Sequence, residues 1–361
     1  MNCNDNQSSK YRSSGLDDLY CALDIHRVSG KNAEAERLAM INWTMLEIGF
    51  TGLALIALGS VSAHAWTPDI ALDQLKVRWA KAPSKFIELD GMQVHYRDEG
   101  PRDDPAPILL LHGTGNSLHT WDAWAEQLKG KHRVIRFDRP GFGLTGPNPT
   151  GDYSMVYFAD FTQRFLDALQ IRKVIVAGNS AGGRVALYLA SRHPERVEKL
   201  VLIASAGYPR NTPSQFAFRL MTSRWLAPIL TRILPRGQVE ANVRNTYGDP
   251  AKVSQEVLDR SYELTLREGN RGALGDNLRQ AQDVNDQALI KAIKVPTLIM
   301  WGSNDHVISM MPDAGNFHRD IAASQLVIFE GSGHMPQEES PAETVAALRQ
   351  FLDPFFWSND V

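Results

Sequence analysis

The 361-residue chain has 43% hydrophobic and 22% charged residues, a composition typical of a globular protein with a substantial core. The formal net charge of −3 provides no overall attraction to nucleic acid, so we expect no nucleic-acid partner. The two cysteines are Cys3 and Cys21, which excludes a disulfide or a cysteine metal site from the rest of the chain.

The first part of the chain differs in composition from the remainder. Residues 1–44 are polar, of mixed charge and without clear periodicity, which predicts a disordered tail. An uncharged apolar run from Ile48 to Val61 follows. It is short for a membrane-spanning helix, which needs about 17 to 25 residues, and it has the length of a signal-peptide core. We expect residues 45–66 to be a single-pass membrane anchor or an export signal, with a buried or amphipathic helix in a cytoplasmic protein as the alternative.

Residues 80–208 carry short apolar strands alternating with helical patterns. Asp90 and Gly91 stand between two runs of β-type residues and predict a hairpin. Further strands are expected at 108–111, 133–137, 174–176 and 200–205, and a helix at 155–169. This alternation predicts an α/β fold with a mostly parallel sheet covered by helices on both faces. In such sheets the functional residues follow the carboxyl ends of the strands.

The alternation breaks over residues 209–294, which show helical periodicity, several prolines and no convincing strand. We expect a helical lid inserted late in the sheet. The core pattern resumes over residues 295–357, with strands at 296–301 and 325–329 and a closing helix at 341–356.

Three loops at strand ends contain the residue types that nucleophilic hydrolysis requires. Ser180 stands in Gly-Asn-Ser-Ala-Gly between a buried strand and a helix, which predicts a sharp turn with an exposed hydroxyl. Asp305 and His334 follow the last two strands. A serine nucleophile needs a base, and the base needs an orienting carboxylate. We therefore predict a catalytic triad of Ser180, His334 and Asp305, although Asp305 could instead be a turn-forming residue.

The combined pattern resembles the α/β-hydrolase superfamily, in its lid-bearing branch. It comprises His112-Gly113, Asp138-x-Pro140-Gly141-x-Gly143, Gly178-x-Ser180-x-Gly182, Gly302-x-x-Asp305 and Gly333-His334, and it runs from about residue 85 to 356. The resemblance implies an oxyanion hole formed by the backbone N–H groups of Thr114 and Ala181, without a metal or organic cofactor. His112 is expected to brace the oxyanion loop, and Asp138 and Arg139 to tie loops together.

The residue types at the predicted site also favour some reactions of this superfamily over others. Epoxide hydrolases and haloalkane dehalogenases of this fold have aspartate as the nucleophile, whereas Ser180 implies an acyl-enzyme and a small-molecule carboxylic ester as the substrate. Asn179 before the serine is similar to the carbon–carbon bond hydrolases of aromatic-ring degradation, but these have tryptophan where this chain has Met335. Cofactor-free perhydrolase or haloperoxidase-like activity and a non-catalytic ligand sensor are further alternatives. Met221, Trp225 and Met335 are the candidate substrate-binding residues, and nothing in the sequence indicates the oligomeric state.

Overall fold

The computed structural model describes residues 66–209, 232–281 and 285–353. The predicted tail, nearly all of the segment 45–66, and Met221 and Trp225 of the predicted lid lie outside these ranges. Within them, no helix is both long enough and apolar enough to cross a membrane.

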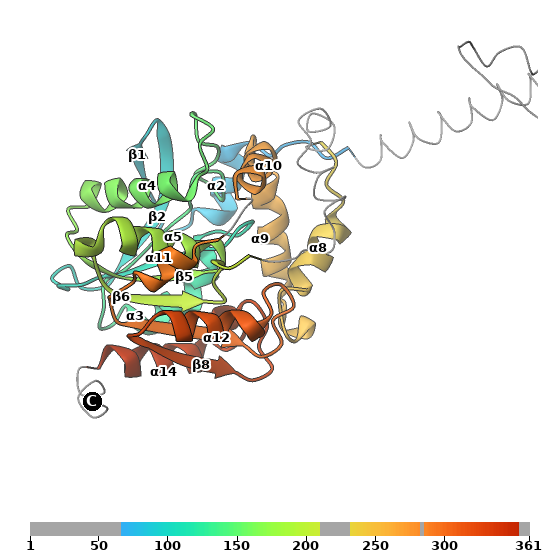
Figure 1. Ribbon diagram of the computed structural model, residues 1–361. Helices are drawn as coiled ribbons and strands as arrows, with labels where there is room; N and C mark the ends of the chain where they lie inside the picture. Colours follow the sequence, from blue (N-terminus) through green and yellow to red (C-terminus); the bar gives the residue numbers. More distant parts are fainter. Residues whose placement is uncertain (1–65, 210–231, 282–284, 354–361) are drawn as a thin grey trace, which may run out of the picture. The chain divides into compact units, whose positions relative to one another are not determined.

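An eight-stranded sheet forms the centre of the fold (Figure 1), which confirms the predicted α/β-hydrolase architecture. Its strands lie in the order β1-β2-β4-β3-β5-β6-β7-β8. They are β1 (Lys85–Leu89), β2 (Met92–Glu99), β3 (Ile108–Leu111), β4 (Val134–Phe137), β5 (Val174–Asn179), β6 (Val197–Ile203), β7 (Thr297–Gly302) and β8 (Ser324–Phe329). β1 and β2 form an antiparallel hairpin, in which Asp90 and Gly91 have φ of 52° and 75°. β2 also pairs antiparallel with β4, and the six strands β4-β3-β5-β6-β7-β8 pair in parallel. All four residues of β3 and all six of β5 are buried, as expected for strands covered on both faces.

Helices cover the two faces of this sheet. They are α3 (Asp122–Leu128), α4 (Met155–Ala168), α5 (Ala181–Arg192), α12 (Met310–Asp320), α13 (Pro336–Glu339) and α14 (Pro341–Leu352). Leu109 and Val176 share one core cluster with aromatic residues of α4 and α12, including Phe161 and Phe317. On the other face, Leu110 packs in a cluster with tryptophans of η1 (Leu118–Trp121) and α3 and with Leu348 of α14. These two clusters hold the strand ends in place.

The chain between β6 and β7 contains further helices among the described residues. They are α8 (Arg236–Arg244), η3 (Pro250–Lys252), α9 (Gln255–Thr265), α10 (Asn270–Gln280) and α11 (Gln287–Lys291). In Figure 1, α8, α9 and α10 lie toward the end of the sheet at which the arrows of β5 and β8 point. This is the carboxyl edge, where the candidate catalytic residues are found.

A helix that the sequence patterns did not predict precedes the hairpin. This helix, α2 (Leu72–Trp79), buries Leu75 and Trp79 against Leu264 of α9 and Leu144. The indole N–H of Trp79 donates a hydrogen bond of 2.8 Å to Glu263. Residues before the hairpin therefore belong to the folded domain and support the inserted helices.

Candidate active site

The turn that carries Ser180 has a strained backbone and very close packing. Ser180 lies between β5 and α5 with φ of 56° and ψ of −121°, a region that non-glycine residues rarely adopt. A Cβ atom on Gly178 would lie 2.3 Å from the carbonyl oxygen of Gly182, and one on Gly182 would lie 2.2 Å from the carbonyl oxygen of Leu111. The glycines on both sides of the serine are thus required by the approach of neighbouring backbones, as a nucleophile elbow demands.

Asp305 and His334 are in direct contact. The imidazole Nδ1 of His334 lies 2.8 Å from Oδ2 of Asp305, and both residues are almost fully buried. The other carboxylate oxygen, Oδ1, accepts hydrogen bonds of 2.8 Å from the backbone N–H groups of Val307 and Ile308. Asp305 therefore forms a turn and orients the histidine at the same time, so the two roles considered from the sequence are compatible.

The loop of His334 is held from three sides. The side-chain amide of Asn179 donates a hydrogen bond of 3.0 Å to the carbonyl of His334, and the N–H of His334 donates one of 2.7 Å to the carbonyl of Thr246. Glu339 accepts hydrogen bonds from the backbone N–H groups of Gly333, at 2.7 Å, and Gly248, at 2.8 Å. Burial raises the pKa of the Glu339 carboxyl, and these backbone hydrogen bonds offset part of this rise. The elbow, the inserted helices and α13 jointly fix the position of the histidine.

The loop after β3 approaches the elbow closely. A Cβ atom on Gly113 would lie 3.2 Å from the Cβ of Ser180, and Thr114 beside it is exposed. Ala181 is the first residue of α5, a position at which the backbone N–H has no partner within the helix. His112 keeps this loop in place, because its Nδ1 faces the carbonyl of Gly113 at 2.8 Å and its Nε2 accepts the N–H of Arg139 at 3.0 Å. Burial, aided by the positive charge of Arg139, lowers the pKa of His112 to about 3.

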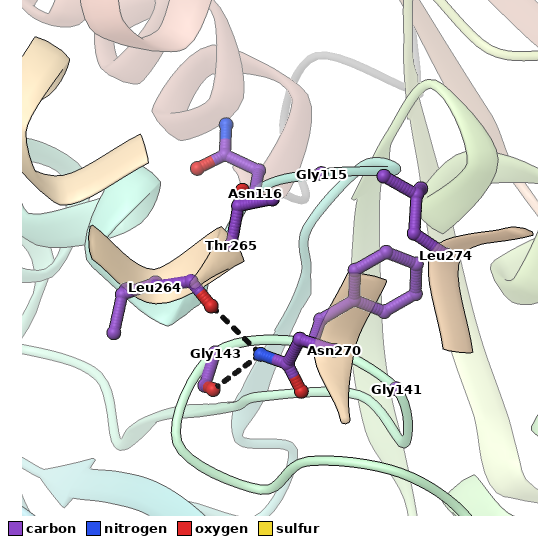
Figure 2. A pocket seen from close by; sticks show the side chains of 9 residues that line it. Gly115, Asn116, Gly141, Gly143, Leu264, Thr265, Asn270 and Leu274 are labelled. Carbon is purple, nitrogen blue, oxygen red and sulfur yellow. Dashed lines mark hydrogen bonds between the residues drawn. The ribbon is translucent and has the colours of Figure 1, made fainter. Parts of the chain in front are cut away.

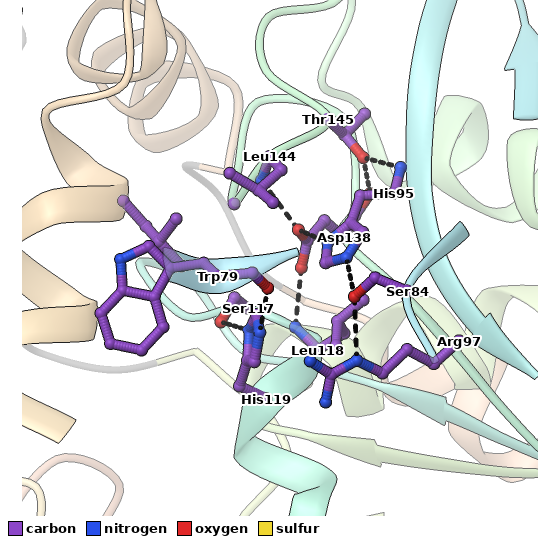
Figure 3. Close-up of polar contacts among 12 residues, drawn as sticks. Trp79, Ser84, His95, Arg97, Ser117, Leu118, His119, Asp138, Leu144 and Thr145 are labelled. Carbon is purple, nitrogen blue, oxygen red and sulfur yellow. Dashed lines mark hydrogen bonds and ion pairs between the residues drawn. The ribbon is translucent and has the colours of Figure 1, made fainter. Parts of the chain in front are cut away.

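Asp138 is the centre of a buried network that joins the loop after β4 to η1 and to β2 (Figure 3). Its carboxylate accepts the N–H of Leu118 at 2.7 Å and the N–H of Leu144 at 2.8 Å, and it lies 2.7 Å from Nδ1 of His95. Burial would raise the pKa of Asp138, but the charge and hydrogen bond of His95 hold it well below its ordinary value. Through Leu118, this aspartate anchors the far end of the loop after β3, which agrees with the loop-tying role expected from the sequence.

A small cavity lies between this loop and the inserted helices (Figure 2). It is lined by Gly115, Asn116, Gly141, Phe142, Gly143, Leu264, Thr265, Asn270 and Leu274. The amide of Asn270 donates hydrogen bonds to the carbonyls of Gly143, at 3.0 Å, and Leu264, at 2.8 Å. Asn270 thus joins the loop after β4 to the helices that cover the carboxyl edge.

The candidate substrate-binding residues have different positions. Met335 is buried in a cluster with Tyr247, Val253 and Leu258, between the histidine loop and the inserted helices, and it does not line this cavity. Met221 and Trp225 lie outside the described residues.

Several residues that shape the site were not identified from the sequence. Glu338 accepts hydrogen bonds from the hydroxyl of Tyr247 at 2.8 Å, from Arg260 at 3.1 Å and from Thr120. Glu338 and Glu339 come directly after the histidine loop, and this proximity was the one available signal. Among the described residues, no group of three or more His, Cys, Asp or Glu side chains is placed to hold a metal ion.

Comparison with known proteins agrees with this geometry. Residues 106–341 match the family model of the α/β-hydrolase fold. An uncharacterised protein of Mycobacterium tuberculosis is 30% identical over 286 residues, which cover 74% of this chain and 81% of that protein. A 2-hydroxymuconate semialdehyde hydrolase of a Pseudomonas species is 28% identical, covering 73% of this chain and 91% of that enzyme. The solved structure of a candidate lipase from Acinetobacter baumannii has a TM-score of 0.65 at 28% identity, covering 78% of this chain and 94% of that one. The chain belongs to the α/β-hydrolase family, and it is a hydrolase of that fold.

Proposed function

We propose that this hydrolase cleaves a carboxylic ester through an acyl-enzyme on Ser180. The observation that carries the proposal is the 2.8 Å contact between Asp305 and His334 at the strand edge where the strained Ser180 turn is held. A buried carboxylate bonded to Nδ1 leaves Nε2 of the imidazole free to take the proton of a serine hydroxyl.

In the proposed mechanism, His334 removes the proton of Ser180 as its Oγ attacks the ester carbonyl. The N–H groups of Thr114 and Ala181 stabilise the negative charge that develops on the carbonyl oxygen. His334 then protonates the leaving alcohol, and afterwards it activates a water molecule that hydrolyses the acyl-enzyme. The close approach of Gly113 to Ser180 supports this assignment, because it brings the loop with Thr114 beside the nucleophile.

Carbon–carbon bond hydrolysis is the second candidate. Two observations favour it: Asn179 precedes the serine, and one relative is a 2-hydroxymuconate semialdehyde hydrolase. In this structure, however, the Asn179 amide donates to the carbonyls of His334 and Ile203. These bonds hold the histidine loop, which ester hydrolysis also requires, so Asn179 does not distinguish the two reactions. We rank the carbon–carbon reaction below ester hydrolysis.

The proposal is tested by labelling with a fluorophosphonate probe and by hydrolysis of p-nitrophenyl esters of increasing acyl length. We expect the wild type to be labelled and to hydrolyse at least the short esters, and Ser180→Ala to lose both properties. Ser154→Ala is the matched control, because Ser154 caps α4 and lies outside the site. Labelling without turnover of any ester, together with cleavage of a meta-cleavage product, would favour the second candidate. Absence of labelling would refute both.

A further inference from the structure

Arg139 is a buried cation without a hydrogen-bond partner in the described part of the chain. Arg139 is 1% exposed, and none of its three guanidinium nitrogens makes a hydrogen bond to a residue that the structure describes. The rings of Phe142 and Phe158 have their centroids 5.0 Å and 4.9 Å from its Cζ. The sequence had predicted a loop-tying role, but only the backbone N–H of Arg139 does this, through His112.

Other buried arginines of the domain are paired. Arg184 makes hydrogen bonds of 2.5 Å and 3.1 Å to Asp286, and Arg260 bonds to Glu338. An uncompensated buried charge is among the most costly features of a folded protein, and two aromatic rings offset this cost only in part. Burial lowers the pKa of Arg139 to about 9, so the guanidinium is still charged at neutral pH. A bound anion would supply the negative charge that the described residues do not place beside this cation.

The position of Arg139 relates it to the candidate active site. Its charge acts on His112, which immediately precedes Gly113 and Thr114 of the oxyanion loop. Phe142, whose ring covers the guanidinium, also lines the cavity of Figure 2 together with Gly115 and Asn116. Phe142 thus contacts the buried cation and also lines a cavity beside the loop after β3.

We propose that Arg139 is the anchor of a carboxylate-binding subsite, so that the preferred esters carry a free carboxylate. The planar guanidinium has unused donors that match the two oxygens of a carboxylate, and movement of the Phe142 ring would open the subsite from the cavity. This inference rests on the proposed ester hydrolysis, and it specifies the substrate class.

The test compares a charged and a neutral substrate of the same acyl chain, monoethyl glutarate and diethyl glutarate. Arg139→Met removes the charge at similar length, and Arg139→Lys keeps the charge without the planar fork. Binding is measured separately, without turnover, as the change in Tm on addition of glutarate or inorganic phosphate. We expect the wild type to prefer the monoester, and the ratio of kcat/KM for the monoester to kcat/KM for the diester to fall about tenfold or more in Arg139→Met. We also expect Arg139→Met without ligand to be at least as stable as the wild type, because an aliphatic side chain replaces an unpaired charge.

The outcomes separate this proposal from the assignment of the triad. If the wild type hydrolyses the diester but shows no preference for the monoester, the carboxylate subsite is refuted and ester hydrolysis stands. Equal Tm shifts with phosphate and glutarate, combined with no substrate preference, would show a general anion site and also refute the substrate claim. If Arg139→Met does not fold, two measurements test the subsite instead: the glutarate titration of the wild type and the same titration of Arg139→Lys. Loss of the glutarate shift in Arg139→Lys supports the subsite, and absence of that shift in the wild type refutes it.

Discussion

The amide of Asn179 donates a hydrogen bond of 3.0 Å to the backbone carbonyl of His334, so the residue before the nucleophile holds the loop of the proposed base. The same amide nitrogen lies 3.2 Å from the carbonyl of Ile203 at the end of β6. One side chain therefore joins the Ser180 turn, the neighbouring strand and the histidine loop, and it sets the relative position of two members of the proposed triad.

Replacing Asn179 tests this positioning role. Asn179→Ala removes both hydrogen bonds, and we expect kcat to fall about tenfold with little change in KM, since a small displacement of the base affects the transition state more than binding. Asn179→Asp places an acceptor against two carbonyls and should reduce kcat further. Steady-state kinetics on a p-nitrophenyl ester, with urea unfolding as the stability control, measure this effect. Wild-type kcat in both variants would contradict it.

Asp305→Asn should fold normally and lower kcat by about 10³ to 10⁴. The amide oxygen can still accept the N–H groups of Val307 and Ile308, but the amide nitrogen favours the wrong tautomer of His334. Asp152→Asn, a change at an exposed residue, provides the matched control. A reduction in kcat of less than tenfold would mean that another carboxylate orients the base.

Glycine substitutions should have opposite effects at two positions. A Cβ atom on Gly183 would lie 2.5 Å from Oγ and 2.8 Å from Cβ of Ser205, so Gly183→Ala should lower the free energy of unfolding by about 1 to 3 kcal/mol. The double variant with Gly183→Ala and Ser205→Gly lacks both of these contacts and should recover part of the lost free energy of unfolding. Gly272 in α10 has no atom within 4 Å of an added Cβ, so Gly272→Ala should stabilise the protein by about 0.5 to 1 kcal/mol. Urea unfolding measures all three variants, and equal effects of the two alanine changes would contradict the packing argument.

Stability should depend on pH through Asp138. Its pKa is lower in the folded protein than in the unfolded chain, so its contribution is complete above the ordinary carboxyl pKa of about 3.9 and is lost as the pH falls below that value. Asp138→Asn removes a buried partner of His95 and should cost about 3 to 5 kcal/mol at pH 7. The difference in free energy of unfolding between wild type and variant should begin to shrink below about pH 5. A difference that stays constant from pH 7 to pH 3.5 would contradict a lowered pKa of Asp138 in the folded protein.

Truncation tests where the folded domain begins. Thr67 donates a backbone hydrogen bond to Arg232, and Trp79 packs against the inserted helices, so a variant starting at Trp66 should keep the ester activity and Tm of the full chain. A variant starting at Lys81 loses the buried side chains of α2 and should unfold at a clearly lower temperature. If the variant starting at Trp66 is insoluble or inactive, the preceding residues are needed for folding, which would favour a buried or amphipathic helix over an anchor or export signal in the segment 45–66.

The sequence allowed prediction of the strands and the elbow because their signals are local. Four consecutive apolar residues from Ile108 and the glycines around Ser180 report directly on burial and on close backbone approach. The braces of the site could not be predicted, because they join distant parts of the chain: Gly248 and Glu339 are 91 positions apart. The helix α2 was missed because only Leu75 and Trp79 of its eight residues are buried, which leaves a weak apolar pattern. The guanidinium of Arg139, which has no hydrogen-bond partner among the described residues, leaves no signal in the sequence.

The hydrogen bond from the N–H of His334 to the carbonyl of Thr246 limits how the inserted helices can evolve or be exchanged. Together with the bond between Gly248 and Glu339, it makes the turn 246–248 part of the support of the base, although this turn belongs to the insertion by sequence. A graft of helices from a relative that replaced this turn would therefore alter turnover as well as substrate choice. Within the insertion 209–294, the residues before Thr246 and those after Gly248 can be exchanged separately while these two hydrogen bonds to the histidine loop and to Glu339 remain.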